Sequence, residues 1–210
     1  MLVATLLLGH VLVSSKPITF VPTDDAWVYP HAGDATTDVY LRVWGSGGDS
    51  VASDPADAGN HSYSYLKFDL SSLKVDEKVV SARLILTHVA NAGFPKEAMA
   101  KTPIEAREVA SGWTEKTWSY DMARQIFPRP GRELILGASL ATGFAADKEF
   151  QIEIPLKGEA FMKLIARKTL ALSLTSAIDP SESGRAFVYK IYSRNEEKES
   201  RRPRLELTVE

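Results

Sequence analysis

The sequence lacks cysteine entirely. Disulfides, thiolate metal sites and cysteine nucleophiles are therefore excluded together, and the fold must be held by packing alone. The apolar run at residues 2–13 is interrupted by Gly9 and His10, and it is shorter than the roughly 18 residues that a membrane-spanning helix needs. We expect no membrane span.

Neither sign of charge dominates. There are 25 Lys and Arg residues against 27 Asp and Glu residues, for a formal net charge of -2. Proteins that bind nucleic acid nonspecifically usually carry a basic field over the whole domain. We therefore expect no nucleic-acid partner, and any cationic site must be local.

Familiar catalytic motifs are also missing. The histidines are scattered, no GxSxG or HExxH motif occurs, and Gly45-Ser46-Gly47-Gly48 is not followed by the Lys and Ser or Thr of a phosphate-binding loop. We expect a protein that is not an enzyme. A polysaccharide lyase stays as an alternative, with a base and a carboxylate-neutralising group drawn from His61 or His88, Tyr65 and Arg83.

The chain is expected to form one domain, residues 20–210, preceded by a secretory signal peptide at residues 1–15. Its 210 residues and 23.1 kDa suit a single β-sandwich. Val13-Ser14-Ser15 provides the small residues of a cleavage site. A basic opening segment is absent, so a buried N-terminal segment is the alternative to export. We expect a secreted protein.

Short alternating segments bounded by turn residues predict an all-β fold: a β-sandwich of two antiparallel sheets with one short helix. The helix is expected at residues 158–168, where Phe161, Leu164 and Ile165 form a stripe. The alternation is clearest at residues 150–154, 170–174 and 205–209, and each of these strands should have one wet face. The expected strands are residues 27–29, 39–44, 63–70, 82–89, 104–109, 150–154, 170–175, 186–193 and 204–209.

Three of these strands carry aromatic and basic side chains opposite their aliphatic ones. Sugar rings pack on aromatic rings, and arginine binds a uronate carboxylate through two parallel hydrogen bonds. Aromatic residues also favour strands in general, so ordinary packing is the alternative. The pattern predicts a wet face that binds an anionic polysaccharide, formed by Tyr40, Arg42, Trp44, Tyr63, Tyr65, Lys67, Lys190, Tyr192 and Arg194.

Two further groups of residues have two interpretations each. Trp113 and Trp118 suit either sugar stacking or packing at the end of the sandwich, and we favour packing because tryptophan is highly buried on average. Loop aspartates suit either a structural calcium ion or solvated turns, which we favour because the spacing matches no EF-hand. These aspartates are Asp24, Asp25, Asp34, Asp38, Asp49, Asp54 and Asp57. No cofactor is required.

Six short segments form a recognisable series along the chain: residues 25–28 (DAWV), 65–73 (YLKFDLSSL), 80–84 (VSARL), 113–118 (WTEKTW), 192–194 (YSR) and 202–205 (RPRL). These segments resemble the DNRLRE domains, grouped as carbohydrate-binding module family 96. They follow the family's order, and the resemblance spans residues 20–210. Residues 45–60, 91–102 and 119–127 are additional to a minimal module.

This resemblance implies a secreted, noncatalytic β-sandwich of jelly-roll type. It also implies binding of a polysaccharide, in particular a polyuronate such as alginate, and association with polysaccharide-degrading enzymes. A structural or adhesive cell-surface domain that docks protein on the same face is the alternative from another class.

Overall fold

Antiparallel strands dominate the computed structural model, which describes residues 15–28, 35–45, 61–74, 77–89, 96–126, 135–139, 147–154, 159–179 and 188–210. The strands are β1 (Lys16–Phe20), β2 (Pro22–Val28), β3 (Tyr40–Val43), β4 (Tyr63–Asp69), β5 (Val79–Thr87), β6 (Glu105–Glu108), β7 (Ile135–Ala138), β8 (Glu149–Ile154), β9 (Thr169–Thr175), β10 (Tyr189–Tyr192) and β11 (Arg204–Val209).

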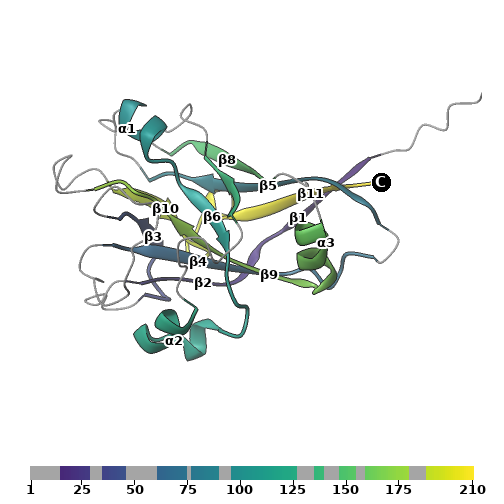
Figure 1. Cartoon of the computed structure of the whole chain (residues 1–210), viewed down its shortest axis with the longest axis horizontal. Coiled ribbons are helices and arrows are strands. Elements are labelled where there is room, and N and C mark those ends of the chain that lie inside the picture. Colours follow the sequence, from purple (N-terminus) through teal and green to yellow (C-terminus); the bar gives the residue numbers. More distant parts are fainter. Residues whose placement is uncertain are drawn as a thin grey trace, which may run out of the picture.

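Two main sheets pack face to face (Figure 1). One has the order β1-β11-β5-β8 and the other β2-β4-β9-β6-β7. Leu84 and Leu207 of the first sheet join Leu66 and Leu172 of the second in one core, and all four side chains are fully buried. The predicted β-sandwich of antiparallel sheets is confirmed.

A separate pair, β3 with β10, connects the two sheets at one end, seen at the left of Figure 1. His88, just after β5, forms a bridge with Ile191 of β10, and Trp44, just after β3, forms a bridge with Ser62 before β4. On the other side, Ser139 after β7 bridges to Ile152 of β8. The strands at this end are therefore paired in a closed ring, which fixes β3 and β10 against both sheets.

The predicted alternation is confirmed for β8 and β11 and is wrong for β9. Along β11 buried and half-buried residues alternate, as expected for a strand with one wet face. Along β9, by contrast, Ala171 and Ser173 are as buried as Leu170 and Leu172. The outer face of the five-stranded sheet is itself covered, by the segment that follows β6.

The predicted helix is present as α3 (Glu159–Ala166). Two more short helices occur, α1 (Lys96–Lys101) and α2 (Tyr120–Gln125). The Ser119 side chain caps α2 by accepting a hydrogen bond from the Met122 amide. Figure 1 shows α2 below the five-stranded sheet. Among the described residues, no helix has the length and apolar character to cross a membrane.

Two strands were not predicted, β1 and β7. β1 pairs with β11 along its whole length, from Lys16 opposite Val209 to Phe20 opposite Leu205. It directly follows the predicted signal peptide, most of which lies outside the described residues, as does nearly all of the additional segment at residues 45–60. β7 is a four-residue strand that pairs with β6, too short to show an alternation.

Gly137 is expected to tolerate no side chain, because β7 approaches β8 closely there. A Cβ atom at Gly137 would lie 2.2 Å from the backbone oxygen of Glu153 and 3.0 Å from the side chain of Ile152. Gly137→Ala should lower the free energy of unfolding by about 1–3 kcal/mol, measured by urea denaturation. Gly112→Ala is the matched control, since a Cβ at Gly112 meets nothing within 4 Å. Equal losses in the two variants would contradict the close approach.

Candidate functional site

The register of β3 with β10 gathers four of the predicted residues on one surface. Lys190 lies opposite Arg42, and Tyr192 lies opposite Tyr40. The alternate residue Leu41 is buried in the core, because successive side chains of a strand point to opposite faces. We call Tyr40, Arg42, Lys190 and Tyr192 the β3–β10 face.

Rings and cations are in contact on the β3–β10 face. The Tyr40 and Tyr192 ring centroids are 5.7 Å apart. The Nζ of Lys190 lies 4.1 Å from the centroid of the Tyr40 ring, and the guanidinium carbon of Arg42 lies 4.4 Å from that of Trp27. Tyr40, Arg42 and Lys190 are each half-buried. Each of these three residues is therefore partly accessible to a ligand.

The two cations of this face differ in their partners. The Nη1 of Arg42 donates to Oδ2 of Asp38 at 2.5 Å, and the two side chains are 26% and 23% exposed. Lys190 has no carboxylate at ion-pair distance within the described part of the chain. Burial, and next the charge of Arg42, lower the pKa of Lys190, while Asp38 opposes this effect. The positive charge of Lys190 is thus the uncompensated one on this face.

Tyr192 is held rigidly at the edge of the face. It is 6% exposed, its hydroxyl donates to Oδ1 of Asp147 at 2.7 Å, and the Nη1 of Arg201 donates to the same hydroxyl at 3.1 Å. The hydrogen bond to Asp147 is the main reason that the pKa of Tyr192 is raised to about 12. Little of this ring is left for a ligand.

Trp44 also departs from the predicted arrangement. It is half-buried, packs partly against the main core and forms the bridge to Ser62. Its position just after β3 therefore serves the closure of the ring of strands.

Tyr63 and Tyr65 are completely buried, so the prediction that they lie on a wet face is wrong. They belong to a second core on the outer side of the five-stranded sheet, together with Trp113 and Ala123. The ring centroid of Tyr65 is 6.2 Å from that of Trp113 and 4.8 Å from that of Trp118. Burial raises the pKa of the Tyr65 hydroxyl. Residues 109–126, which we call the cover segment, seal this face.

The predicted packing role of Trp113 is confirmed, because its side chain is fully buried. Trp118 is half-buried, and its Nε1 donates to the backbone oxygen of Trp27 at 3.3 Å. The two tryptophan rings contact each other, with centroids 5.0 Å apart. Both tryptophans pack on the ring of Tyr65, which the sequence predicts as a stacking surface for a sugar.

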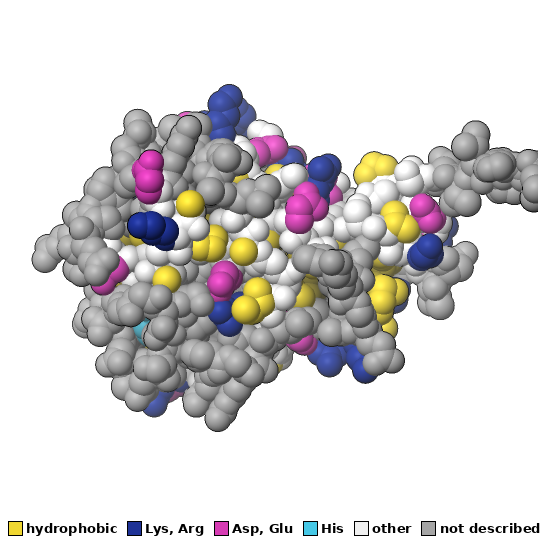
Figure 2. All heavy atoms as spheres, turned by 45° about the horizontal axis from the view of Figure 1, so that its top comes forward, with side chains coloured by type: hydrophobic (Ala, Val, Ile, Leu, Met, Phe, Trp, Pro, Cys, Tyr) yellow, Lys and Arg dark blue, Asp and Glu magenta, His cyan; other side chains and the backbone are white. Residues whose placement is uncertain are grey.

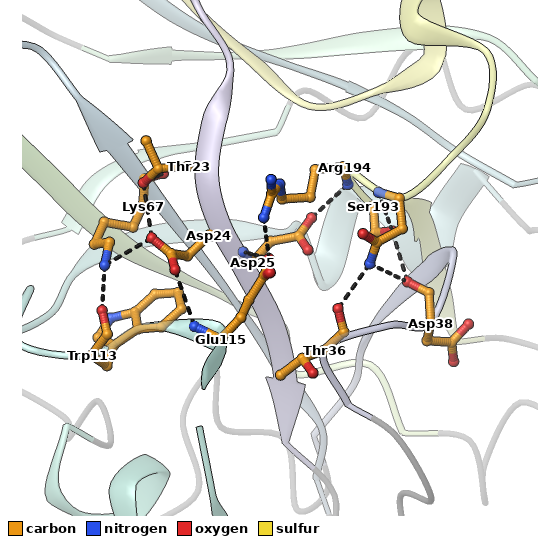
Figure 3. Close-up of polar contacts among 11 residues, drawn as sticks. Thr23, Asp24, Asp25, Thr36, Asp38, Lys67, Trp113, Glu115, Ser193 and Arg194 are labelled. Atoms are coloured by element: carbon orange, nitrogen blue, oxygen red, sulfur yellow. Dashed lines mark hydrogen bonds and ion pairs between the residues drawn. The ribbon is translucent and has the colours of Figure 1, made fainter. Parts of the chain in front are cut away.

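Lys67 holds the cover segment (Figure 3). Its Nζ lies 2.8 Å from Oδ2 of Asp24 and donates to the backbone oxygen of Trp113. Oδ1 of Asp24 accepts in turn from the Glu115 amide at 3.0 Å. Burial alone would raise the pKa of Asp24, but the hydrogen bonds from Lys67 and Glu115 outweigh it and the pKa is lowered. Lys67 is thus satisfied internally.

Arg194 is satisfied in the same network. Its Nη1 donates to Oε1 of Glu115 at 2.7 Å, and its backbone amide donates to Oδ2 of Asp25 at 2.6 Å. The Asp25 amide also donates to Oε1 of Glu115. The predicted cations Lys67 and Arg194 therefore lie together beside β2, apart from the four residues that β3 and β10 pair.

Residue types alone did not reveal which carboxylates serve as internal partners. Asp24, Asp25 and Asp38 were predicted as turn or calcium residues, and each instead binds a cation or a backbone amide. No group of acidic or histidine side chains suited to a metal ion occurs among the described residues. The remaining aspartates of that set, Asp34, Asp49, Asp54 and Asp57, lie outside them.

The alternative lyase arrangement is not assembled. His61, His88 and Tyr65 are at most 1% exposed. Arg83 lies on β5, in the sheet that does not contain Tyr65, and is exposed, with its Nη2 2.7 Å from Oε2 of Glu206.

No model of a known protein family matches the chain, and no curated protein is significantly similar to it. The likeness to DNRLRE domains therefore rests on the motifs quoted above.

Trp113→Ala should lower the free energy of unfolding by about 3–5 kcal/mol, because it empties the centre of the second core. Urea denaturation measures this loss. Trp113→Phe is the matched control and should lose much less, since the Nε1 of Trp113 has no hydrogen-bond partner among the described residues. Equal losses for the two variants would contradict a role in packing.

Asp25 should make stability depend on pH. Burial is the main reason that its pKa is raised from 3.8 to about 7, with the Glu115 charge adding to the effect and the Arg194 amide opposing it. The folded chain then holds this proton more tightly than the unfolded chain. The stabilisation is full below about pH 4 and is lost as the pH rises to about 7.

Asp25→Asn removes this titration. The free energy of unfolding of Asp25→Asn minus that of the unchanged protein should therefore rise between about pH 4 and pH 7. Urea denaturation at several pH values measures it. His88, whose pKa burial lowers to about 4, titrates in both proteins and cancels in the difference. A difference that is constant with pH would contradict the prediction.

Proposed function

We propose that this chain is a secreted, noncatalytic β-sandwich module of jelly-roll type that binds an acidic polysaccharide on the β3–β10 face. The observation that carries the proposal is the contact between the uncompensated cation Lys190 and the half-buried ring of Tyr40. The resemblance to DNRLRE domains supports the same class of ligand. It also suggests polysaccharide-degrading enzymes as partners.

The chemistry of the face suits a sugar that carries a carboxylate. The half-buried ring of Tyr40 supplies an apolar surface, and the ammonium of Lys190, which lies over that ring, offers up to three hydrogen-bond donors to a carboxylate. Arg42, opposite Lys190 on the neighbouring strand, adds a second cation. Strands joined to both sheets support these groups, so little ordering is needed on binding.

The binding residues we propose are fewer than the sequence predicts. Tyr40, Arg42 and Lys190 form the ligand surface, with Tyr192 at its edge. Tyr63 and Tyr65 are excluded by burial. Lys67 and Arg194 are excluded because they belong to the network of Asp24 and Glu115 beside β2, apart from the β3–β10 face.

The described charged side chains on the face drawn in Figure 2 are mixed in sign. Basic and acidic side chains are interspersed there, without a broad patch of one sign among the described residues. This agrees with the formal net charge of -2. An anionic polymer would therefore be attracted locally.

The alternative of an adhesive domain that docks protein has less support. Such a surface would show a contiguous apolar patch. The large hydrophobic side chains exposed in the described residues lie on separate segments, Val21 between β1 and β2, Tyr120 on α2, Ile135 on β7 and Met162 on α3.

Lys190→Gln should weaken binding to polyuronates about tenfold, the effect of losing one charge-assisted hydrogen bond of about 1.5 kcal/mol. Affinity electrophoresis in gels with alginate, pectate or a neutral glucan measures this. Lys116→Gln, which removes an exposed lysine of the cover segment, is the charge-matched control and should bind like the unchanged protein. Equal migration of the unchanged protein in all three gels would overturn the proposed function.

A further inference from the structure

We propose that Asp38 is a resident competitor for the anionic ligand of the β3–β10 face and that it restricts this face to polymers with widely spaced single charges. The inference rests on the proposed function of that face. It assigns a specificity role to a residue outside the predicted binding set.

The carboxylate of Asp38 occupies the place that a ligand carboxylate would take. Its Oδ2 lies 2.5 Å from Nη1 of Arg42, and its Oδ1 accepts from the Tyr40 amide at 3.1 Å. The side chain is 23% exposed. A ligand that reaches Arg42 therefore meets a guanidinium that is already engaged by a negative charge.

The main chain of Asp38 is held independently of this carboxylate. Its backbone oxygen accepts from Oγ of Ser193 at 2.7 Å and from Nδ2 of Asn195 at 3.4 Å. Figure 3 shows these contacts, with the carboxylate of Asp38 directed away from them. The segment that precedes β3 is thus also anchored by contacts that do not involve the charge of Asp38.

The charges of the face then set its selectivity. Arg42 and Lys190 are adjacent cations, and Asp38 neutralises one of them, which leaves one net positive charge among the three. A polymer with one carboxylate per sugar places a single anion on Lys190. A sulfated polymer brings several anions close together, and Asp38 repels those that approach Arg42.

Asp38→Asn tests this role. The asparagine keeps Oδ1 as an acceptor for the Tyr40 amide and removes the charge. Binding is measured by calorimetry with polygalacturonate and with dextran sulfate at several salt concentrations. We expect affinity for dextran sulfate to rise about tenfold, affinity for polygalacturonate to rise less, and the slope of log Kd against log salt to increase by about one.

Two comparisons separate competition from a general change in charge or fold. Glu153→Gln makes the same change in net charge at an exposed position of β8 and should leave both affinities unchanged. In an Arg42→Met background the gain from Asp38→Asn should disappear, because the contested cation is absent. If Asp38→Asn does not fold, Asp38→Ser replaces it, since a serine hydroxyl also accepts from a backbone amide.

The possible results distinguish the two proposals. If the unchanged protein binds neither polymer, the proposed function is overturned and the role of Asp38 falls with it. If it binds polygalacturonate while Asp38→Asn binds dextran sulfate no more tightly, or with an unchanged salt slope, the competitor role is overturned and the proposed function stands.

Discussion

The structure depends on the second core that seals the outer side of the five-stranded sheet. Because Trp113 and Trp118 pack on Tyr65 there, β9 is buried on both faces. Burial of this surface in turn requires the cations and carboxylates at its margin to be paired, since an isolated buried charge is strongly disfavoured. The interaction of Asp24 with Lys67 and that of Glu115 with Arg194 meet this requirement.

The residues of the motifs that resemble DNRLRE domains therefore mainly stabilise the fold. Asp25, Lys67, Trp113, Glu115 and Arg194 come from four separate motif segments and meet in one network around the cover segment. Most of the β3–β10 face lies outside these segments. The likeness thus supports an architecture more directly than it supports a particular sugar.

The closed ring of strands explains why the proposed ligand surface lies on β3 and β10. Bridges from Trp44 to Ser62 and from His88 to Ile191 tie this short pair to both sheets. The pair thereby presents Arg42 and Lys190 from a rigid support. Asp38, whose backbone is fixed by Ser193, places an acidic group beside them, so the character of the surface is set by three charges.

Sequence alone determined the all-β class, the position of most strands, the amphipathic helix α3 and the burial of Trp113, because each depends on local periodicity or on the burial preference of a residue type. It also determined which strands carry rings and cations. Tertiary structure decided which of these side chains meet solvent. Tyr63 and Tyr40 both lie on strands in which aromatic and aliphatic residues alternate. The cover segment buries Tyr63, whereas Tyr40 is half-buried. Likewise, Lys67 forms an ion pair with Asp24, far away in the chain, and Lys190 forms none within the described residues. Periodicity along a strand contains no information about such long-range contacts.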